Sequence, residues 1–379
     1  MSHVALIVPG LDRIGGAERQ AILLAKGLCR RGWRVSVVAL SGAGGDAAAG
    51  LIAAGAGFLT LRMRKGLADP RGWIRFHRWL RRERPDVVHA HLPHAAWLAR
   101  WSRLGAPVRV ELDTLHSSST GTAGRRLGYR WSGWLANRVT AVSHAAAAAH
   151  LSARMATPGK ILVLPNGVEV EEWRPDAPER SAVRRELGLE DEFLWLAAGR
   201  LEPVKDYPTL LAAMAKVPEP TRLLIAGSGP LKDELLGLSA RLGLERRVRF
   251  LGFEPDLRRW MRTADGFVLS SRWEGLPMGL LEAAACSLPA VATDGAGTSE
   301  VLVDGQSGWL TQAGDSAALA EAMTRMMRTP PDERRAMGER ARQLASERFS
   351  LETILDRWEA LYRELLQRNP RPARWGRAD

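Results

Sequence analysis

Two glutamates, Glu274 and Glu282, lie eight residues apart in the stretch SRWEGLPMGLLEAAACSLPAVATDGAG, which is otherwise largely apolar and glycine-rich. The segment GLPMG interrupts the first half of this spacing, so we expect Glu274 on a loop and Glu282 about one turn inside the following helix. Two acids beside the amides of a helix N-terminus suit a polyhydroxylated, phosphorylated ligand. The alternative is a solvated helix start with one acid near the positive end of the helix dipole.

Two cations, Arg200 and Lys205, follow a predicted strand in AAGRLEPVKDYPTL and precede a helix that we expect to start near Tyr207. A guanidinium fork and an ammonium point charge in one loop suit a pyrophosphate. The alternative is a pair of solvated loop cations. Gly227 and Gly229 in IAGSGPLKDEL resemble a nucleotide-binding loop, but the third glycine of an NAD fingerprint is missing.

A glycine pair, Gly15 and Gly16, opens a predicted helix in VPGLDRIGGAERQ. This is not G-x-G-x-x-G, so the pair does not support a dinucleotide fold. It still lets a phosphate or sugar approach backbone amides, although a plain flexible loop would look the same.

Histidines follow two strand ends, His91 in VHAHLPH and His116 in ELDTLHSSST. Ligands of open parallel sheets bind beyond the carboxyl ends of the strands, so we expect both side chains in a cleft. His89 is expected to be a packed strand residue. The H-x-H spacing invites a metal, but no neighbouring cysteine or acid cluster completes a metal site.

The composition describes a folded chain of 379 residues with two distant cysteines, which indicates a reducing compartment without disulfides. Its net charge of +12 is concentrated in residues 1–170, where Lys and Arg far outnumber Asp and Glu. The chain starts with a short strand pattern rather than a signal peptide, and no apolar run approaches the roughly 20 residues of a membrane span. We expect a cytoplasmic protein. The sequence contains no Walker A loop and no G-x-S-x-G elbow, which disfavours NTPases and serine hydrolases.

Short apolar runs alternate with amphipathic helical stretches twice along the chain, as in a parallel sheet covered on both faces. The runs predicted to be strands are VALIVPG, RVSVVAL, DVVHAH, VRVEL and RVTAVS in the first half, and LWLAAGR, TRLLIAGSG, RVRFLGF, GFVLSS and PAVATD in the second. One helix is expected over GAERQAILLAKGLCRRG, and a long final helix over 351–368. We expect an α/β chain of two domains, 1–170 and 171–350, joined near residues 168–180, where Pro175 and Pro178 mark the joint. The end of the chain, QRNPRPARWGRAD, is expected to be a basic tail.

Several of these motifs occur in an order that resembles the retaining glycosyltransferases of family 4. The resemblance extends over nearly the whole chain, from GGAERQ to VLVDGQSGWL. The motifs are Gly15-Gly16, His116, Asn166-Gly167-Val168, Gly199-Arg200 with Lys205-Asp206, Gly227-Ser228-Gly229, and Glu274 with Glu282. The family has the GT-B architecture, in which two Rossmann-like domains face each other across a cleft and the last helix returns to the first domain.

The resemblance implies roles for the matching residues. Glu282 would bind the ribose hydroxyls of a nucleotide-sugar, and Glu274 would lie beside the donor sugar. Arg200 and Lys205 would neutralise the pyrophosphate as the leaving group departs. Amides near Gly279 and Leu280, with the glycines Gly15, Gly16 and Gly227, would line the donor site. His116 would reach the sugar near the reaction centre, and His91 would lie on the acceptor side.

The implied activity is transfer of a sugar from a nucleotide-sugar to a glycan or lipid-linked acceptor, with retained anomeric configuration, as in surface polysaccharide or lipopolysaccharide biosynthesis. No D-x-D sequence occurs, which is consistent with an enzyme that needs neither metal nor cofactor. Ser287 stands where the family often has glycine, and DGAGTSE replaces a more usual glycine pair but keeps Glu300. One alternative is a non-catalytic sugar-nucleotide-binding scaffold. Another, supported only by the alternation of strand and helix patterns, is an NAD-dependent oxidoreductase.

Two stretches mix arginine with aromatic residues, RMRKGLADPRGWIRFHRWLRRERPD and RRLGYRWSGWLANR. Basic helices with aromatic side chains dock on anionic membranes, which suits a lipid-linked acceptor on the inner face of the membrane. In the first stretch, Trp73, Phe76 and Leu80 are at helical spacing and would face the lipid. The alternative is that these residues pack on the sheet while the arginines face water. No recognised nucleic-acid module accompanies either stretch, so we expect no nucleic-acid partner.

Overall fold

The computed structural model describes residues 1–379 except 13, 64–68, 107, 296 and 371–379. Most of the expected basic tail therefore lies outside the described residues. The chain divides into two compact units, which we call unit 1 (Met1–Gly167 with Leu351–Asp379) and unit 2 (Val168–Ser350). The chain leaves unit 1 after Gly167, at the start of the expected joint. Pro178 lies in the first turn of a helix of unit 2, where a missing N–H costs nothing.

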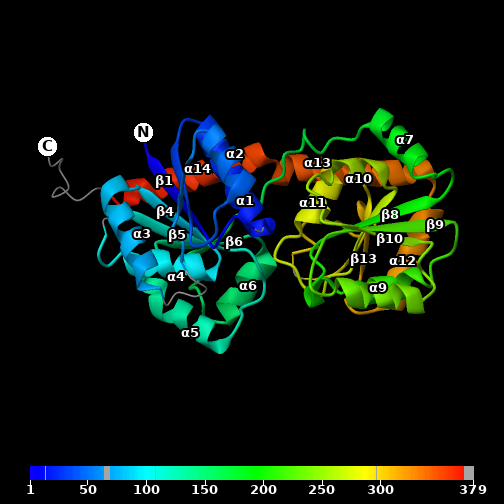
Figure 1. Ribbon diagram of the computed structural model, residues 1–379, viewed down its shortest axis with the longest axis horizontal. Helices are drawn as coiled ribbons and strands as arrows, with labels where there is room; N and C mark the ends of the chain where they lie inside the picture. The colour runs from blue at the N-terminus through cyan, green and yellow to red at the C-terminus, as the bar shows by residue number, and fades with distance from the viewer. Residues whose placement is uncertain (13, 64–68, 107, 296, 371–379) are drawn as a thin grey trace. The chain divides into compact units, whose positions relative to one another are not determined.

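Unit 1 is built on a seven-stranded parallel sheet of order β3-β2-β1-β4-β5-β6-β7 (Figure 1). The strands are β1 (His3–Val8), β2 (Arg34–Ala39), β3 (Gly57–Thr60), β4 (Val87–His91), β5 (Val110–Leu115), β6 (Arg138–Ala141) and β7 (Ile161–Val163). The sequence predicted the five central strands and missed β3 and β7. These two strands are short and lie at the sheet edges, where half-burial weakens the apolar pattern.

Helices cover both faces of this sheet. One face packs against α1 (Gly16–Arg30), α2 (Gly45–Ala53) and α14 (Leu351–Arg368). The other face packs against α3 (Pro70–Glu83), α4 (Pro93–Ser102) and α5 (Ala123–Ser132). The 3₁₀ helix η1 (Gly133–Leu135) continues α5, and α6 (His144–Ser152) packs on β6 and β7.

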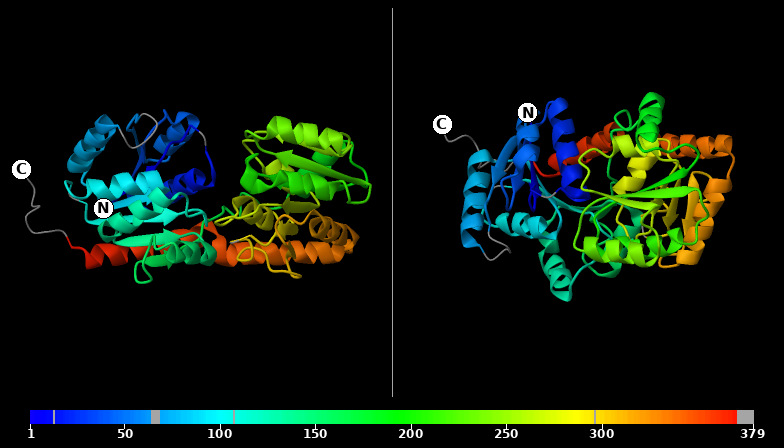
Figure 2. Two further views of the ribbon diagram at one scale, coloured as in Figure 1. Left: turned by 90° about the horizontal axis from the view of Figure 1, so that it is seen from below. Right: turned by 45° about the vertical axis from the view of Figure 1, so that its right-hand side comes forward.

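The final helix, α14, belongs to unit 1 although it follows the whole of unit 2 in sequence (Figure 2). Its apolar face, including Leu355 and Trp358, joins the core formed by α1 and the sheet. Gly27 of α1 allows this close packing, because a Cβ there would lie 2.5 Å from a methyl group of Leu355. The predicted inner face of α1, Ala21 to Leu28 at helical spacing, is buried.

Unit 2 is built on a six-stranded parallel sheet of order β10-β9-β8-β11-β12-β13. The strands are β8 (Phe193–Ala198), β9 (Thr221–Ala226), β10 (Val248–Gly252), β11 (Gly266–Leu269), β12 (Ala290–Thr293) and β13 (Gly308–Thr311). The sequence predicted all of them except the edge strand β13. Unit 2 thus repeats the Rossmann-like, α/β plan of unit 1.

The core of unit 2 packs one face of its sheet against α8 (Tyr207–Met214), α9 (Lys232–Arg241) and α12 (Ser316–Arg328). The remaining helices of the unit pair with one another, α7 (Ala177–Glu186) with α10 (Arg258–Thr263) and α11 (Met278–Ala285) with α13 (Pro331–Phe349). The 3₁₀ helix η2 (Pro203–Lys205) precedes α8.

Of the two orientations left open for α3, the structure has the one in which the helix packs on the sheet. Phe76 and Leu80 are fully buried in the core against the sheet, and Trp73 is half-buried against the same core. Asp69 caps the helix and Gly72 lies against Met63, which fixes the helix in this orientation. The arginines of α3 face water. Among the described residues, no helix is long and apolar enough to cross a bilayer.

Candidate active site

The carboxyl ends of β8 and β11 bring together Lys205 and Glu274, which are 69 residues apart in sequence. Lys205 Nζ donates a hydrogen bond to Glu274 Oε1 at 2.5 Å, and Ser271 Oγ donates to the same oxygen at 2.7 Å. Both charged side chains are largely buried, being 21% and 14% exposed. Burial of this kind makes an ion pair hold its geometry more firmly than a surface pair does.

The second predicted cation, Arg200, has a different environment. Its side chain is 68% exposed and pairs with Glu202 on the same loop. An ion pair in water contributes little, so Arg200 can change partners at small cost. The two predicted cations therefore differ. Lys205 is held in place by Glu274, whereas Arg200 is exposed and available to an anionic ligand.

Two glycine-containing loops pack backbone to backbone at this edge of the sheet. The amide of Leu201 donates to the carbonyl of Ser228 at 3.0 Å. A Cβ on Gly227 would lie 1.9 Å from the carbonyl oxygen of Gly199, and Gly227 has a φ of +145°. A Cβ on Gly229 would lie 2.4 Å from the carbonyl oxygen of Leu201. The glycines are needed for the close approach of the loops that carry Arg200 and Lys205.

Helix α11 positions the two acids as the sequence predicted. It begins at Met278, so Glu274 lies on the preceding loop and Glu282 in the second turn, where it is 2% exposed. The Leu280 amide donates to the carbonyl of Pro277 at 3.1 Å. The Gly279 amide belongs to the first turn, where a helix offers no acceptor of its own, and is the better placed of the two for a ligand oxygen.

The end of β12 and the loop that follows it pack against the loop that carries Glu274. Thr293 Oγ1 donates to the carbonyl of Ser271 at 2.5 Å. A Cβ on Gly297 would lie 1.9 Å from the carbonyl oxygen of Gly275, so this glycine of DGAG is required for close packing. Residue 296 of the same motif lies outside the described residues. Ser287 has a φ of +56°, the conformation for which glycine is favoured.

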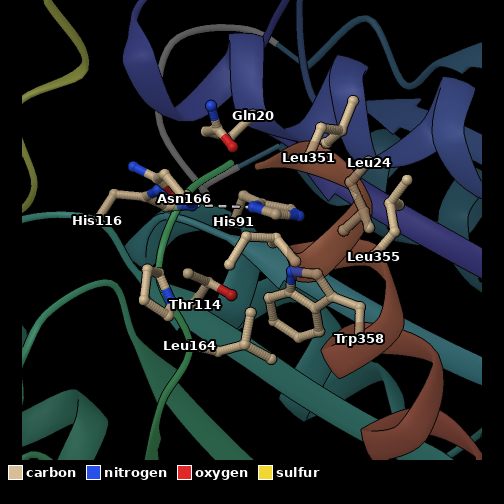
Figure 3. Close-up of a pocket in the computed structure, with 12 residues that line it drawn as sticks. Gln20, Leu24, His91, Thr114, His116, Leu164, Asn166, Leu351, Leu355 and Trp358 are labelled. Carbon is tan, nitrogen blue, oxygen red and sulfur yellow. Dashed lines mark hydrogen bonds between the residues drawn. The ribbon is translucent and has the colours of Figure 1, made fainter. Parts of the chain in front are cut away.

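In unit 1, the predicted pair of histidines meets at the ends of β4 and β5. His91 Nδ1 and His116 Nε2 are 2.9 Å apart and share one hydrogen bond (Figure 3). Burial lowers the pKa of His116 to about 4 and, with the neighbouring histidines, lowers that of His91 well below its usual value. Both rings are therefore neutral near pH 7. Within the described part of the chain, the other ring nitrogens, His91 Nε2 and His116 Nδ1, are buried without a hydrogen-bond partner.

A buried polar chain behind His91 holds the strand ends in place. His89 is fully buried, as expected of a packed strand residue, and its ring nitrogens lie 2.7 Å from Tyr362 Oη and 2.7 Å from Thr114 Oγ1. Thr114 in turn lies 2.7 Å from Thr140 Oγ1. The final helix α14 thus contributes Tyr362 to the support of the histidines.

A small cavity of about 20 Å³ adjoins the histidine pair and has room for a single water. Figure 3 shows Gln20, Asn166 and the apolar face of α14 around it. Gln20 was missed by the sequence reasoning. Its side-chain amide donates to the Gly167 carbonyl at 2.8 Å and accepts from the Gly167 amide at 2.9 Å, which fixes the turn after Asn166. A polar residue four positions before Leu24 on the inner face of α1 was the available signal.

The glycine pair opens α1 as predicted, with Gly15 as the N-cap and Gly16 as the first helical residue. The amide of Gly15 already donates to Glu18 Oε2 at 3.1 Å. A ligand anion at this helix start would compete with that carboxylate. Among the described residues, no group of three or more His, Cys, Asp or Glu side chains is arranged to hold a metal ion.

The chain matches two models of known protein families. Residues 14–172 match the model of Glycosyltransferase Family 4, and residues 179–344 match that of Glycosyl transferases group 1. The N-acetyl-alpha-D-glucosaminyl L-malate synthase of Bacillus anthracis is 29% identical over 302 residues, 76% of each chain. The UDP-Gal:alpha-D-GlcNAc-diphosphoundecaprenol alpha-1,3-galactosyltransferase of Escherichia coli is 27% identical over 69% of this chain and 71% of its own.

Solved structures agree on the fold. The Anabaena protein HepE, crystallised with UDP and glucose, superposes with a TM-score of 0.83 at 23% identity, over 95% of this chain and 99% of its own. The two family models between them span most of both units, and the Escherichia coli relative is a galactosyltransferase by name. The chain belongs to the family 4 glycosyltransferases and is a glycosyltransferase of GT-B architecture.

Proposed function

We propose that this enzyme transfers a sugar from a nucleotide-sugar to a glycan or lipid-linked acceptor and retains the anomeric configuration of the donor. The observation that carries the proposal is the Lys205–Glu274 ion pair at the strand ends of unit 2, beside the exposed Arg200 and the first turn of α11. A nucleoside diphosphate gains negative charge as the glycosidic bond breaks. Preorganised cations and amides at that position stabilise the charge most effectively.

Lys205 and Arg200 would share the diphosphate in different ways. The ammonium of Lys205 has three N–H donors, of which Glu274 takes one, so a phosphate oxygen can be bound without breaking the pair. Arg200 would exchange its bond to Glu202 for a forked contact to the phosphates. The Lys205 contact would be fixed before the donor binds, and the Arg200 contact would form on binding.

Glu282 and His116 would orient the donor. Glu282, held inside α11, would accept hydrogen bonds from the ribose hydroxyls, and its rigid position favours one nucleotide orientation. His116 would act as a neutral hydrogen-bonding group toward the sugar, because burial lowers its pKa to about 4. His91, hydrogen-bonded to it, would fix the tautomer of His116 from the acceptor side.

Two comparisons support the substrate classes. HepE was solved with UDP and glucose, and the Escherichia coli relative is named for a UDP-galactose donor and a diphosphoundecaprenol-linked acceptor. A surface polysaccharide or lipopolysaccharide pathway fits such an acceptor. The proposal assigns neutralisation of the diphosphate to Arg200 and Lys205 and requires no resident metal or cofactor, so activity should survive excess EDTA.

The test uses purified full-length protein with UDP-, GDP- and ADP-sugars in separate reactions, with and without candidate acceptors. The proposal predicts release of the nucleoside diphosphate from at least one donor, slowly by hydrolysis and faster with a suitable acceptor. Proton NMR of the earliest product should show the anomeric configuration of the donor. An inverted product would overturn the retaining assignment. Tight donor binding without turnover would favour the scaffold alternative, against which the intact Lys205–Glu274 pair argues.

A further inference from the structure

A continuous apolar face is exposed to water on α5 and η1. Leu127, Trp131 and Trp134 are 55%, 71% and 65% exposed. Their spacing of four and three residues puts all three on one side of the helix, while Tyr129 and Leu135 on the other side are buried. We call this exposed side the α5 face. Two largely exposed tryptophans on one helical turn are unusual for a surface that only meets water.

The orientation of α5 is fixed by its inner side, so the tryptophans cannot turn inward. The Arg100 guanidinium lies over the Tyr129 ring at 4.4 Å and donates to the Tyr129 carbonyl at 3.2 Å and to Ser132 Oγ at 3.0 Å. Gly128 lies directly against Trp97 of α4, since a Cβ there would be 2.0 Å from the indole. Figure 1 shows α5 beside α4 at the outside of unit 1.

The stretch of chain that carries the α5 face has charged residues of one sign. No acidic residue occurs between Asp113 and Glu169, a stretch that includes α5, η1 and α6. Arg130 is exposed between Leu127 and Trp131, and Arg125 and Arg126 flank the first turn, half-buried. The same stretch also carries Arg138, Arg154 and Lys160. An apolar helix face on a stretch whose charged residues are all cations is complementary to an anionic lipid surface.

We propose that the α5 face docks the protein on an anionic membrane surface, with Trp131 and Trp134 at headgroup depth and Arg130 against the lipid phosphates. A second copy of the chain fits the α5 face less well. A two-fold contact through this face would bring Arg130 of each copy close to the arginines of the other, and like charges repel. Tryptophan is also the side chain that favours the membrane interface, where its ring is apolar and its N–H remains hydrated. The proposal concerns a surface separate from the donor site and does not depend on which sugar is transferred.

The experiment measures sedimentation of the full chain with sucrose-loaded vesicles of phosphatidylcholine alone or with phosphatidylglycerol. Binding is expected to the anionic vesicles at low salt and to weaken as salt screens the charges. Trp131→Gln with Trp134→Gln should weaken binding by about tenfold for each tryptophan that enters the interface. Arg130→Gln should weaken it by about fivefold, the contribution expected of one arginine near the surface.

Matched controls separate docking from general surface effects. Leu127→Gln should weaken vesicle binding, whereas Ile52→Gln, which changes an equally exposed apolar residue on α2, should not. Arg241→Gln on α9 of unit 2 is the control for Arg130→Gln. Thermal unfolding should be unchanged in all of these variants, and donor hydrolysis in solution should be unaffected because none of them touches the donor site.

Failure of the docking proposal and failure of the proposed function give different results. Equal binding to neutral and anionic vesicles, no binding to either, or unchanged binding by the double tryptophan variant would overturn the docking proposal while leaving donor turnover intact. Loss of self-association in that variant, without any vesicle binding, would assign the α5 face to a second copy. Binding of single-stranded RNA in place of vesicles would assign it to nucleic acid.

Discussion

The two units share one plan, a parallel sheet with candidate residues at the carboxyl ends of its strands, yet they fill that edge with opposite chemistry. Unit 2 places charged groups there, with Lys205 and Glu274 paired at 2.5 Å and Arg200 exposed. Unit 1 places His91 and His116 there, both kept neutral by burial. The arginines of α3 and Arg130 of α5 are instead exposed on the surface of unit 1.

The difference fits what we propose that each site holds. A diphosphate needs fixed positive charge, and a partly buried lysine held by a carboxylate supplies it. A sugar hydroxyl needs neutral hydrogen-bonding groups, and a histidine with a pKa of about 4 remains neutral over the range in which a free histidine would titrate. The same fold therefore provides a charged site at the strand ends of unit 2 and an uncharged site at the strand ends of unit 1.

The largest expected effect is on the charged site. Lys205→Ala should lower turnover by about 10²-fold or more, the scale of losing one preorganised charge contact in a transition state. Lys216→Ala, an exposed lysine of the same unit, is the matched control and should behave as wild type. Steady-state kinetics of nucleoside diphosphate release measure both. Near-normal turnover by Lys205→Ala would remove this residue from the leaving-group site.

The neutral site predicts a pH dependence of stability. His116 has a lowered pKa in the folded chain, so between about pH 6.5 and 4 the unfolded chain binds more protons and the free energy of unfolding falls as the pH falls. The loss is about 1.4 kcal/mol per pH unit for each such histidine. Urea denaturation at several pH values measures it. His116→Gln should flatten this slope, and the exposed His94→Gln should not; equal slopes in all three proteins would contradict the buried neutral pair.

A smaller effect is expected for the ribose contact. Glu282→Gln keeps the shape of a buried side chain but removes the charge that would accept the ribose hydroxyls, so KM for the donor should rise about tenfold with a smaller change in kcat. Glu321→Gln, an exposed acid of α12, is the control. An unchanged KM in Glu282→Gln would place the ribose elsewhere.

The smallest effect is expected at the exposed cation. Arg200→Gln should raise the donor KM about threefold to fivefold, because a solvent-exposed charge contributes only about 1 kcal/mol or less. The effect should shrink at high salt, unlike that of Lys205→Ala. If Arg200→Gln were as damaging as Lys205→Ala, the two cations would not differ in the way that their burial indicates.

The sequence predicted the parts of the fold whose pattern is strongest. Central strands such as β1 and β8 are buried on both faces and appear as continuous apolar runs. The three missed strands, β3, β7 and β13, are short edge strands with half-buried residues, whose patterns do not differ from those of loops. Loop residues such as Lys205 and Glu274 could be found because they follow strand ends.

Supporting residues whose contacts lie far away in sequence could not be predicted in the same way. Nothing local shows that Tyr362 of α14 supports His89 or that Gln20 fixes the turn after Asn166, because each contact depends on how α14 and α1 pack. The orientation of the two Arg/Trp stretches could not be predicted from the sequence either. Their compositions are alike, but Phe76 and Leu80 of α3 face the sheet while Trp131 of α5 faces water. Only the rotation of each helix against its neighbours separates them.

The most direct test of the central claim, that the charged edge of unit 2 holds a nucleotide-sugar, is thermal unfolding of the chain with UDP-, GDP- and ADP-sugars. A donor at 100 times its Kd should stabilise the folded chain by about 2.7 kcal/mol. We predict a clear rise in Tm with at least one donor for the wild type and for Lys216→Ala, and its loss in Lys205→Ala. The claim would be contradicted if Lys205→Ala showed as large a rise in Tm as the wild type, or if no donor raised the Tm of the wild type.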